Sequence, residues 1–175
     1  MPEVAEEVAD LRKRLARLEA IQAIERLKYR YWRACDSKDP EGFRECFVKE
    51  GADVDYGPGL GTFTDRETLV ELYRALALRR QEGRWMYHDI HHGGHPDIEL
   101  IGDETATGSW TFGFMRVNLV DQVIERASLE YRDTYVIEDG VWKIQKSHVT
   151  PLTSFSIPIP DGARVGPGPE QAGTE

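Results

Sequence analysis

Four of the five histidines in this chain fall within one short segment, Tyr87–His95. Imidazole is the usual general base of enzymes because its pKa lies near neutrality. Asp36 stands far upstream, at the end of a stretch with helical periodicity. A carboxylate bonded to the second ring nitrogen of a histidine fixes its tautomer and stabilises the imidazolium that forms. We therefore hypothesise that His91 faces a pocket and pairs there with Asp36.

A histidine-rich tract also suggests a zinc site, and this alternative stays open. Side chains alternate between the two faces of a strand, so His91 and His95 share one face and His88 and His92 share the other. The four rings could converge only if Gly93-Gly94 supplied a bulge. We expect no metal, with His88 and His92 at the surface or at an interface.

A long helix, predicted from Val4 to about Asp36, must position the carboxylate. Its outer half, up to Arg17, is densely charged and either projects towards another subunit or lies on the surface. Its inner half should pack on the core. An aspartate at a helix C-terminus opposes the helix dipole at a cost of about 0.3–1 kcal/mol, so Asp36 either has a partner or faces water. The apolar positions recur every three or four residues: Val8, Leu11, Leu15, Leu18, Ile21, Ile24, Leu27 and Tyr31.

Two shorter helices and a short strand are expected next. Asp39-Pro40-Glu41 predicts a helix start with an N-cap, a proline and an early acid. Thr64 and Glu67 have capping-box spacing, and Gly83 would close the helix that they begin. Between the two helices, alternation over residues 52–56 indicates a half-buried strand.

After Gly83 the apolar residues recur at every second position instead of every third or fourth. This period predicts strands at about 85–100, 104–117, 123–137 and 141–149. Gly102-Asp103 and Asp139-Gly140 are hairpin signals, and strands joined by tight turns are antiparallel. The fold class is therefore α+β, a cone-shaped fold in which a strongly curved antiparallel sheet wraps a pocket and three helices pack on it. Residues 1–153 form one domain, with a charged helical extension over about 1–18. Residues 154–175 form a tail rich in proline and glycine.

Composition limits the partners. The net charge of −9 and the pI near 5.1 argue against nucleic acid, since phosphate binding needs a basic face. No apolar run approaches the roughly 20 residues of a membrane span. The charged N-terminus lacks the basic segment followed by an apolar segment that is typical of a signal peptide. Cytoplasm is the expected location. Cys35 and Cys46 are expected to be buried thiols in a reducing compartment.

Several local patterns resemble the SnoaL-like proteins of the nuclear-transport-factor-2-like superfamily. The resemblance covers roughly residues 15–150 and is nearest to the branch of scytalone dehydratase, hexachlorocyclohexane dehydrochlorinase and bile-acid 7α-dehydratase. The residues that carry it are Ala23-Ile24, Leu27, Tyr31 and Asp36 on the opening helix, then Met86-Tyr87-His88, His91, His95, Ile98-Glu99-Leu100, Gly102-Asp103 and Ala106, and finally Tyr131, Asp133, Tyr135, Asp139-Gly140 and Trp142-Lys143-Ile144.

The resemblance implies a catalytic Asp–His dyad at Asp36 and His91 and no metal or organic cofactor. Tyr31 matches a tyrosine that helps to hold the substrate oxygen in the two dehydratases. His95 stands where these relatives often carry asparagine, and we expect it to line the pocket.

Three further candidates for the pocket lie on the later strands. Trp110 sits on a mostly apolar strand face, where core packing is the alternative to lining a pocket. Lys146 and His148 share a face near a strand end, where solvent exposure is the alternative. We carry all three as candidate substrate-binding residues.

As an expectation, the protein is a cofactor-independent lyase of the dehydratase type that acts on an apolar, ring-containing substrate such as a steroid or a polyketide. An isomerase with the same base stays open, as does a non-catalytic subunit or ligand-binding protein of the same fold. The resemblance also implies a homo-oligomer, with a trimer favoured and a dimer as the alternative.

Overall fold

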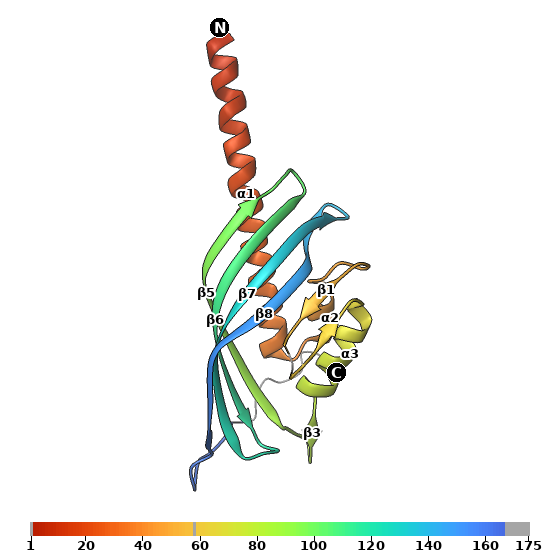
Figure 1. Ribbon diagram of the computed structural model, residues 1–175, viewed down its shortest axis with the longest axis vertical. Coiled ribbons are helices and arrows are strands. Elements are labelled where there is room, and N and C mark those ends of the chain that lie inside the picture. The colour runs from red at the N-terminus through yellow and green to blue at the C-terminus, as the bar shows by residue number, and fades with distance from the viewer. Residues whose placement is uncertain (1, 58, 167–175) are drawn as a thin grey trace.

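Three helices and a six-stranded sheet build the molecule, which confirms the predicted α+β class (Figure 1). The computed structural model describes residues 2–57 and 59–166 of the 175-residue chain. The elements are α1 (Pro2–Ser37), α2 (Pro40–Arg44), β1 (Asp53–Asp55), β2 (Thr62–Phe63), α3 (Arg66–Ala77), β3 (Arg80–Gln81), β4 (Arg84–Trp85), β5 (Tyr87–Leu100), β6 (Thr105–Asn118), β7 (Val123–Glu138) and β8 (Val141–Pro158).

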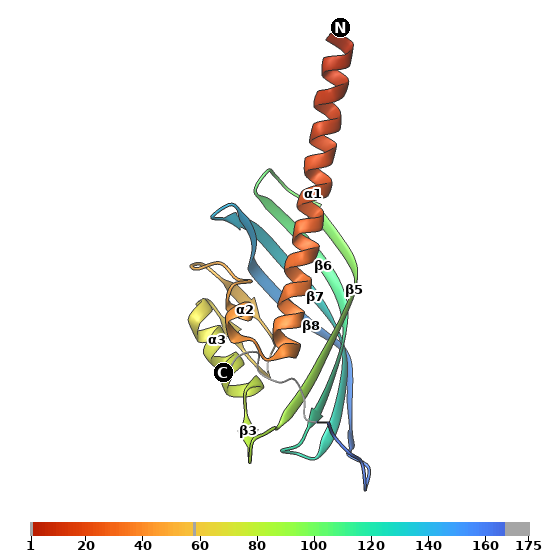
Figure 2. The same ribbon diagram turned by 180° about the vertical axis from the view of Figure 1, so that it is seen from behind.

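The large sheet has the strand order β2-β1-β8-β7-β6-β5, and β5 to β8 form a curved antiparallel meander as predicted. The sheet is mixed rather than purely antiparallel, because β1 pairs with β8 in parallel, with Asp53 opposite Lys146. Helix α3 and strands β2 to β7 separate β1 from β8 along the chain, and such a long connection permits parallel pairing. The C-terminal half of α1 lies along one side of the sheet, and its N-terminal half projects beyond it (Figures 1 and 2).

Strand β8 corrects the predicted end of the domain. The sequence placed the start of the tail at residue 154, but β8 continues to Pro158 and pairs with β7 as far as Val123. The described part of β1 pairs only with residues 146–148, so the outer half of β8 is an edge, where prolines such as Pro151 are tolerated. Residues 167–175 of the predicted tail lie outside the described residues. The two-residue strands β2, β3 and β4 were not predicted.

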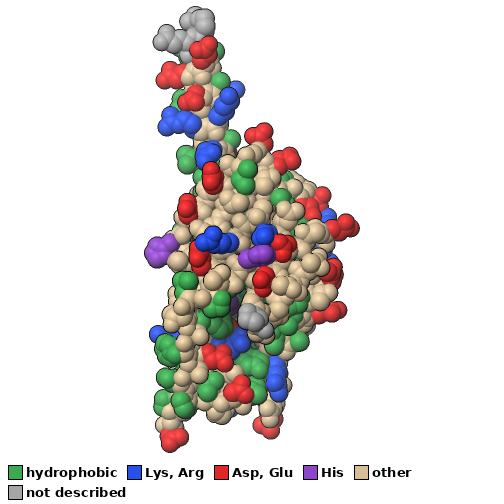
Figure 3. All heavy atoms as spheres, in the orientation of Figure 1, with side chains coloured by type: hydrophobic (Ala, Val, Ile, Leu, Met, Phe, Trp, Pro, Cys, Tyr) green, Lys and Arg blue, Asp and Glu red, His purple; other side chains and the backbone are tan. Residues whose placement is uncertain are grey.

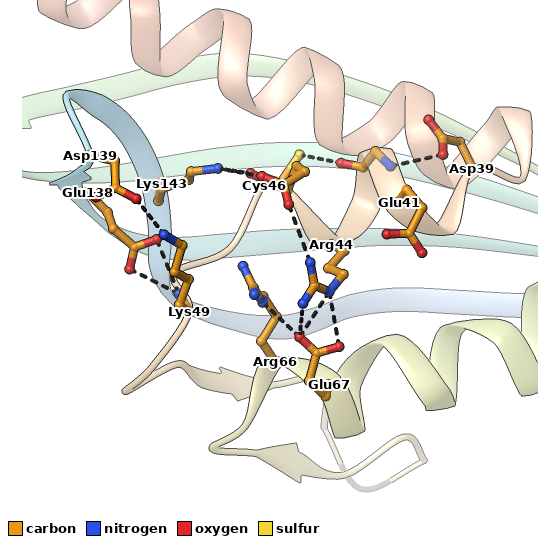
Figure 4. Close-up of polar contacts among 12 residues, drawn as sticks. Asp39, Glu41, Arg44, Cys46, Lys49, Arg66, Glu67, Glu138, Asp139 and Lys143 are labelled. Carbon is orange, nitrogen blue, oxygen red and sulfur yellow. Dashed lines mark hydrogen bonds and ion pairs between the residues drawn. The ribbon is translucent and has the colours of Figure 1, made fainter.

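Helices α2 and α3 begin at aspartate N-caps and are joined by ion pairs. Asp39 accepts a hydrogen bond from the Gly42 N–H, as predicted, whereas the cap of α3 is Asp65, one residue after the predicted Thr64. The Arg44 guanidinium holds both carboxylate oxygens of Glu67, at 2.6–3.0 Å (Figure 4). These contacts fix α3 as a cover over the space between α1 and the sheet.

A buried ion pair lies in the core between α1 and β7. Lys28 Nζ is 2.7 Å from Asp133 Oδ2, and both side chains are fully buried. The ammonium also lies 3.5 Å from the ring centre of Tyr131. Tyr135 donates to the same carboxylate oxygen, and Trp110 donates to Tyr135. This network anchors the inner half of α1 to the concave face of the sheet.

Candidate active site

A cavity of about 220 Å³ opens between the curved sheet, the end of α1 and the inner face of α3. The space-filling view shows a hollow bordered by hydrophobic side chains in the lower half of the molecule (Figure 3). The wall of the cavity is mostly apolar, and its apolar part includes Phe43, Leu69, Leu72, Phe112, Phe114 and Leu129. A small set of polar side chains also lines the wall: Tyr31, Tyr56, Tyr73, Tyr131, Asp89, His91 and Arg116. An apolar cavity with few polar groups is typical of a site for a small hydrophobic molecule.

The last turn of α1 and the first half of β5 bring Asp36 and His91 together. Nδ1 of His91 lies 2.6 Å from Oδ1 of Asp36. The backbone N–H of His91 also donates to the two carboxylate oxygens, at 3.1 and 3.3 Å. The imidazole is 12% exposed and the carboxylate 31%. The aspartate at the helix end therefore has the compensating partner that its unfavourable position requires.

This contact determines how the His91 ring can work. An ionised carboxylate only accepts hydrogen bonds, so Asp36 requires a proton on Nδ1 and leaves the lone pair on Nε2. Among the described residues, Nε2 makes no hydrogen bond. The ring stacks on Phe112, with centroids 5.6 Å apart and an interplanar angle of 9°, and Phe114 packs at 5.2 Å. Rigid aromatic neighbours thus hold the ring in one orientation, in which Nε2 can act on a ligand in the cavity.

Three tyrosines contribute hydroxyl groups to another part of the wall. The Tyr31 and Tyr56 hydroxyls are 2.8 Å apart, and the Tyr131 ring packs edge-on against Tyr31 at 6.2 Å. Burial is the main cause that raises the pKa of each of these tyrosines above its ordinary value. They remain neutral near pH 7, so they can donate hydrogen bonds to a carbonyl or hydroxyl oxygen of a ligand.

An ion triad meets the wall at Asp89 and Arg116. Asp89 lies between Lys38, at 2.9 Å, and Arg116, at 2.7 Å. Burial alone would raise the pKa of Asp89, but the two cations and their hydrogen bonds outweigh it and hold that pKa below its usual range. Arg116 uses Nε for this contact, and among the described residues its Nη2 makes no hydrogen bond. Arg116 therefore offers a donor to the cavity.

His95 lies outside the wall of the cavity, contrary to its expected place. One extra residue of β5 is accommodated between Gly94 and Asp97, opposite β6, and His95 takes a φ of 50° there. This bulge reverses the alternation that would have put His95 on the face of His91. The ring is exposed instead, and its Nδ1 lies 2.6 Å from the Thr111 hydroxyl.

Lys146 and His148 also lie outside the wall, and a second bulge explains their placement. The register between β7 and β8 shifts between Thr134 and Tyr135, which leaves Gln145 unpaired. Trp142 and Ile144 face the core before the shift, and Ser147 and Val149 face inward after it. Lys146 and His148 therefore point outward, where both contact the carboxylate of Asp53, at 3.2 and 2.9 Å.

Trp110 belongs to the core, which was the alternative to its lining the pocket. It is 1% exposed, and its indole N–H donates to Tyr135 at 2.8 Å. It packs edge-on against Trp32 at 5.4 Å, and Trp32 in turn packs against Phe112 of the cavity wall. Tyr31, by contrast, does line the cavity together with His91.

Sequence reasoning missed Tyr56, Asp89 and Arg116 as parts of the wall. Asp89 was recognisable, because it stands two residues before His91 and so shares its strand face. Arg116 follows Phe112 and Phe114 with the same alternation. Tyr56 lies just beyond a three-residue strand, and its approach to Tyr31 depends on tertiary structure that no local pattern shows.

No group of three or more metal-ligating side chains occurs within residues 2–57 and 59–166. In the same part of the chain, no helix combines the length and apolar character needed to cross a membrane.

The curved sheet, the covering helices and the enclosed polar groups define a cone-shaped fold built around an internal cavity. The sequence matches the SnoaL-like domain over residues 16–148, and the chain belongs to that family. This confirms the resemblance drawn from the sequence. A search of curated proteins found no match.

Solved structures show the same fold at low sequence identity. A hexachlorocyclohexane dehydrochlorinase (LinA) type 2 has a TM-score of 0.72 and 20% identity over 87% of this chain and 97% of that one. A protein described as a putative scytalone dehydratase from Novosphingobium aromaticivorans has a TM-score of 0.71 and 19% identity, covering 91% and 98% of the two chains. The LinA-type3 dehydrochlorinase of Novosphingobium barchaimii has a TM-score of 0.71 and 19% identity, over 87% of this chain and 98% of that one. The neighbours thus include lyases.

Proposed function

We propose that the protein is a cofactor-independent lyase that eliminates water from a small, mainly apolar, ring-containing molecule. The observation that carries the proposal is the 2.6 Å contact between Nδ1 of His91 and Asp36, in a histidine that lines an apolar cavity. The two dehydrochlorinases and the protein described as a putative scytalone dehydratase, all structural neighbours, favour an elimination over other chemistry.

In this mechanism His91 takes a proton through Nε2 from a carbon next to a carbonyl group. Asp36 keeps the ring in the required tautomer and stabilises the imidazolium. The electron pair of the broken C–H bond forms the new C=C bond as the C–O bond breaks. The departing hydroxide takes the proton from His91 and leaves as water, so the base returns to its starting state.

Tyr31, Tyr56 and Arg116 act as donors in this proposal. Tyr31 hydrogen-bonds the departing oxygen or the carbonyl, with Tyr56 orienting its hydroxyl at 2.8 Å. Arg116 reaches a second polar group of the substrate. A general base typically contributes 10²–10⁴-fold, so such preorganised donors must supply the remaining acceleration.

The composition of the wall sets the substrate class. Aromatic and aliphatic side chains bound most of the cavity, and Tyr31, Tyr56 and Arg116 are among the few hydrogen-bond donors in its wall. A flat or fused-ring molecule with a ketone and a β-hydroxyl group, such as a steroid or a polyketide, fits this distribution. We also propose that the protein works as a homo-oligomer.

The test is a mass-spectrometric screen in deuterated water with hydroxylated steroid ketones and aromatic polyketide alcohols. His91→Ala is run beside the wild type, and His92→Ala serves as control because His92 is an exposed neighbour. Loss of water from one compound, absent only in His91→Ala, is the expected result. Deuterium uptake without loss of water would establish an isomerase instead. Dehydration that survives in His91→Ala would remove His91 as the base.

A further inference from the structure

The N-terminal half of α1 leaves the body of the protein without covering anything. It projects beyond the sheet in both ribbon views (Figures 1 and 2). Every residue from Val4 to Glu19 is exposed. Isolated helices of this length are marginal in water, because helix stability in proteins comes mainly from packing of an apolar face. A continuous helix here indicates a packing partner.

One side of this projecting segment carries a regular apolar stripe. Its members are 40–64% exposed: Val4, Val8, Leu11, Leu15 and Leu18. Successive members are separated by 4, 3, 4 and 3 residues. This is the spacing of the a and d positions of a heptad repeat, which forms the seam of a coiled coil. Val8 and Leu15 occupy a, and Val4, Leu11 and Leu18 occupy d.

The flanking charges select a partner and an orientation. In this register Glu7 and Arg14 occupy g, and Arg12 and Glu19 occupy e. In a parallel pair of identical helices, each g residue lies near the e′ residue five positions further along the partner. The two resulting contacts, Glu7 with Arg12′ and Arg14 with Glu19′, both join opposite charges. The segment is therefore complementary to itself when two copies run side by side in the same direction.

We propose that residues 4–18 form a parallel, in-register coiled coil with the same segment of a second copy of this chain. The pairing buries the apolar stripe and joins two protomers at their N-terminal helices, away from the cavity. It uses a surface that is separate from the sheet and from the residues of the candidate active site, so it stands independently of the proposed activity.

The first test is disulfide cross-linking of the full-length chain carrying Leu11→Cys. A d position meets its own counterpart across a parallel seam, so mild oxidation should convert most of the protein to a covalent dimer. The native Cys35 and Cys46 are buried and should not interfere. Lys13→Cys is the matched control, because position 13 lies on the opposite side of the helix. An antiparallel pair would place residue 11 opposite residue 8 or 15 instead.

The second test changes the flanking charges and measures the cross-linking yield in the Leu11→Cys background at low salt. Glu7→Arg places like charges opposite each other and should lower the yield on the order of fivefold. Adding Arg12→Glu restores opposite charges and should restore the yield. The proposal is overturned if Leu11→Cys gives no dimer, if Lys13→Cys cross-links equally well, or if the charge exchange fails to restore pairing. Unchanged circular dichroism confirms that each variant is folded.

Discussion

At the residue scale, the candidate site depends on two carboxylates with different surroundings. Asp36 bonds to the ring and to the main chain of His91. Asp89, two residues earlier on the same strand, is held between Lys38 and Arg116. The first therefore acts on the histidine, and the second neutralises and orients cations. The same side-chain type thus serves two different purposes, Asp89 in the cavity wall and Asp36 behind His91.

Replacing either member of the Asp36–His91 pair should remove the base. We expect His91→Ala and Asp36→Asn each to lower the rate of the reaction by roughly 10²–10⁴-fold, since asparagine disrupts the tautomer that the base requires. The double variant should be little worse than either single variant, because the two residues act as one unit. Steady-state kinetics of all three variants check this, and rate losses that multiply would contradict it.

The buried Lys28–Asp133 pair makes a prediction about stability. Lys28→Met leaves a buried carboxylate without its cation and should lower the free energy of unfolding by about 3–5 kcal/mol. Adding Asp133→Asn removes the unpaired charge while keeping an acceptor for Tyr135, so most of the loss should be recovered. Urea denaturation measures both. A double variant that is less stable than Lys28→Met would show that the charge is not the cause.

At the scale of elements, α1 and β5 approach so closely that only glycine fits at one point of contact. A Cβ added at Gly93 would meet the indole ring of Trp32, whereas a Cβ at Gly94 would meet nothing within 4 Å. Trp32 also packs against Phe112, on which His91 stacks. The position of the helix relative to β5, the strand that carries His91, therefore depends on Gly93.

Gly93→Ala should destabilise the protein by about 1–3 kcal/mol through overpacking, because Trp32 must shift. Gly94→Ala, one residue further along the same strand, should change stability by less than about 0.5 kcal/mol. Thermal or urea unfolding of the two variants gives the comparison. Equal effects of the two substitutions would mean that backbone entropy, not the contact with Trp32, is responsible.

Much of this arrangement was predictable from the sequence, and the failures have physical causes. The helix that ends at Asp36 and the hairpins at Gly102-Asp103 and Asp139-Gly140 follow from local patterns. The bulges near His95 and at Gln145 reverse strand alternation without a clear local signal, so His95 was expected on the wrong face, and the exposed positions of Lys146 and His148 could not be separated from a pocket role. The outer part of β8 contains prolines and polar residues, and its pairing with β7 depends on long-range register.

At the scale of the whole molecule, the interior combines a large apolar surface with many neutral ionisable groups. Burial raises the pKa of five tyrosines: Tyr31, Tyr56, Tyr73, Tyr131 and Tyr135. It also raises the pKa of Cys46 to about 11 and raises that of Cys35. The folded protein therefore keeps protons that the unfolded chain releases in alkaline solution.

This difference predicts alkaline unfolding. Below about pH 10 the tyrosines are neutral in both states, and their full contribution to stability is present. Above that pH the unfolded state binds fewer protons, so each buried tyrosine lowers the free energy of unfolding by about 1.4 kcal/mol per pH unit. The pKa of Lys28 is lowered, mainly by burial, so this residue makes the free energy of unfolding rise with pH, but only up to about pH 10.5. Urea titrations near pH 8 and pH 11 should show a steep loss, and equal stabilities would contradict it.

Helix α1 runs without interruption from Pro2 to Ser37, so the same rigid rod carries the apolar stripe at one end and Asp36 at the other. The angle between the two is set by the number of residues between them. Seven extra residues after Leu18 would turn the stripe by only about 20° relative to the cavity, whereas two would turn it by about 200°. If the stripe joins two copies, the length of this helix can change without reorienting one cavity relative to the other only by nearly whole numbers of turns, such as about 7, 11 or 18 residues.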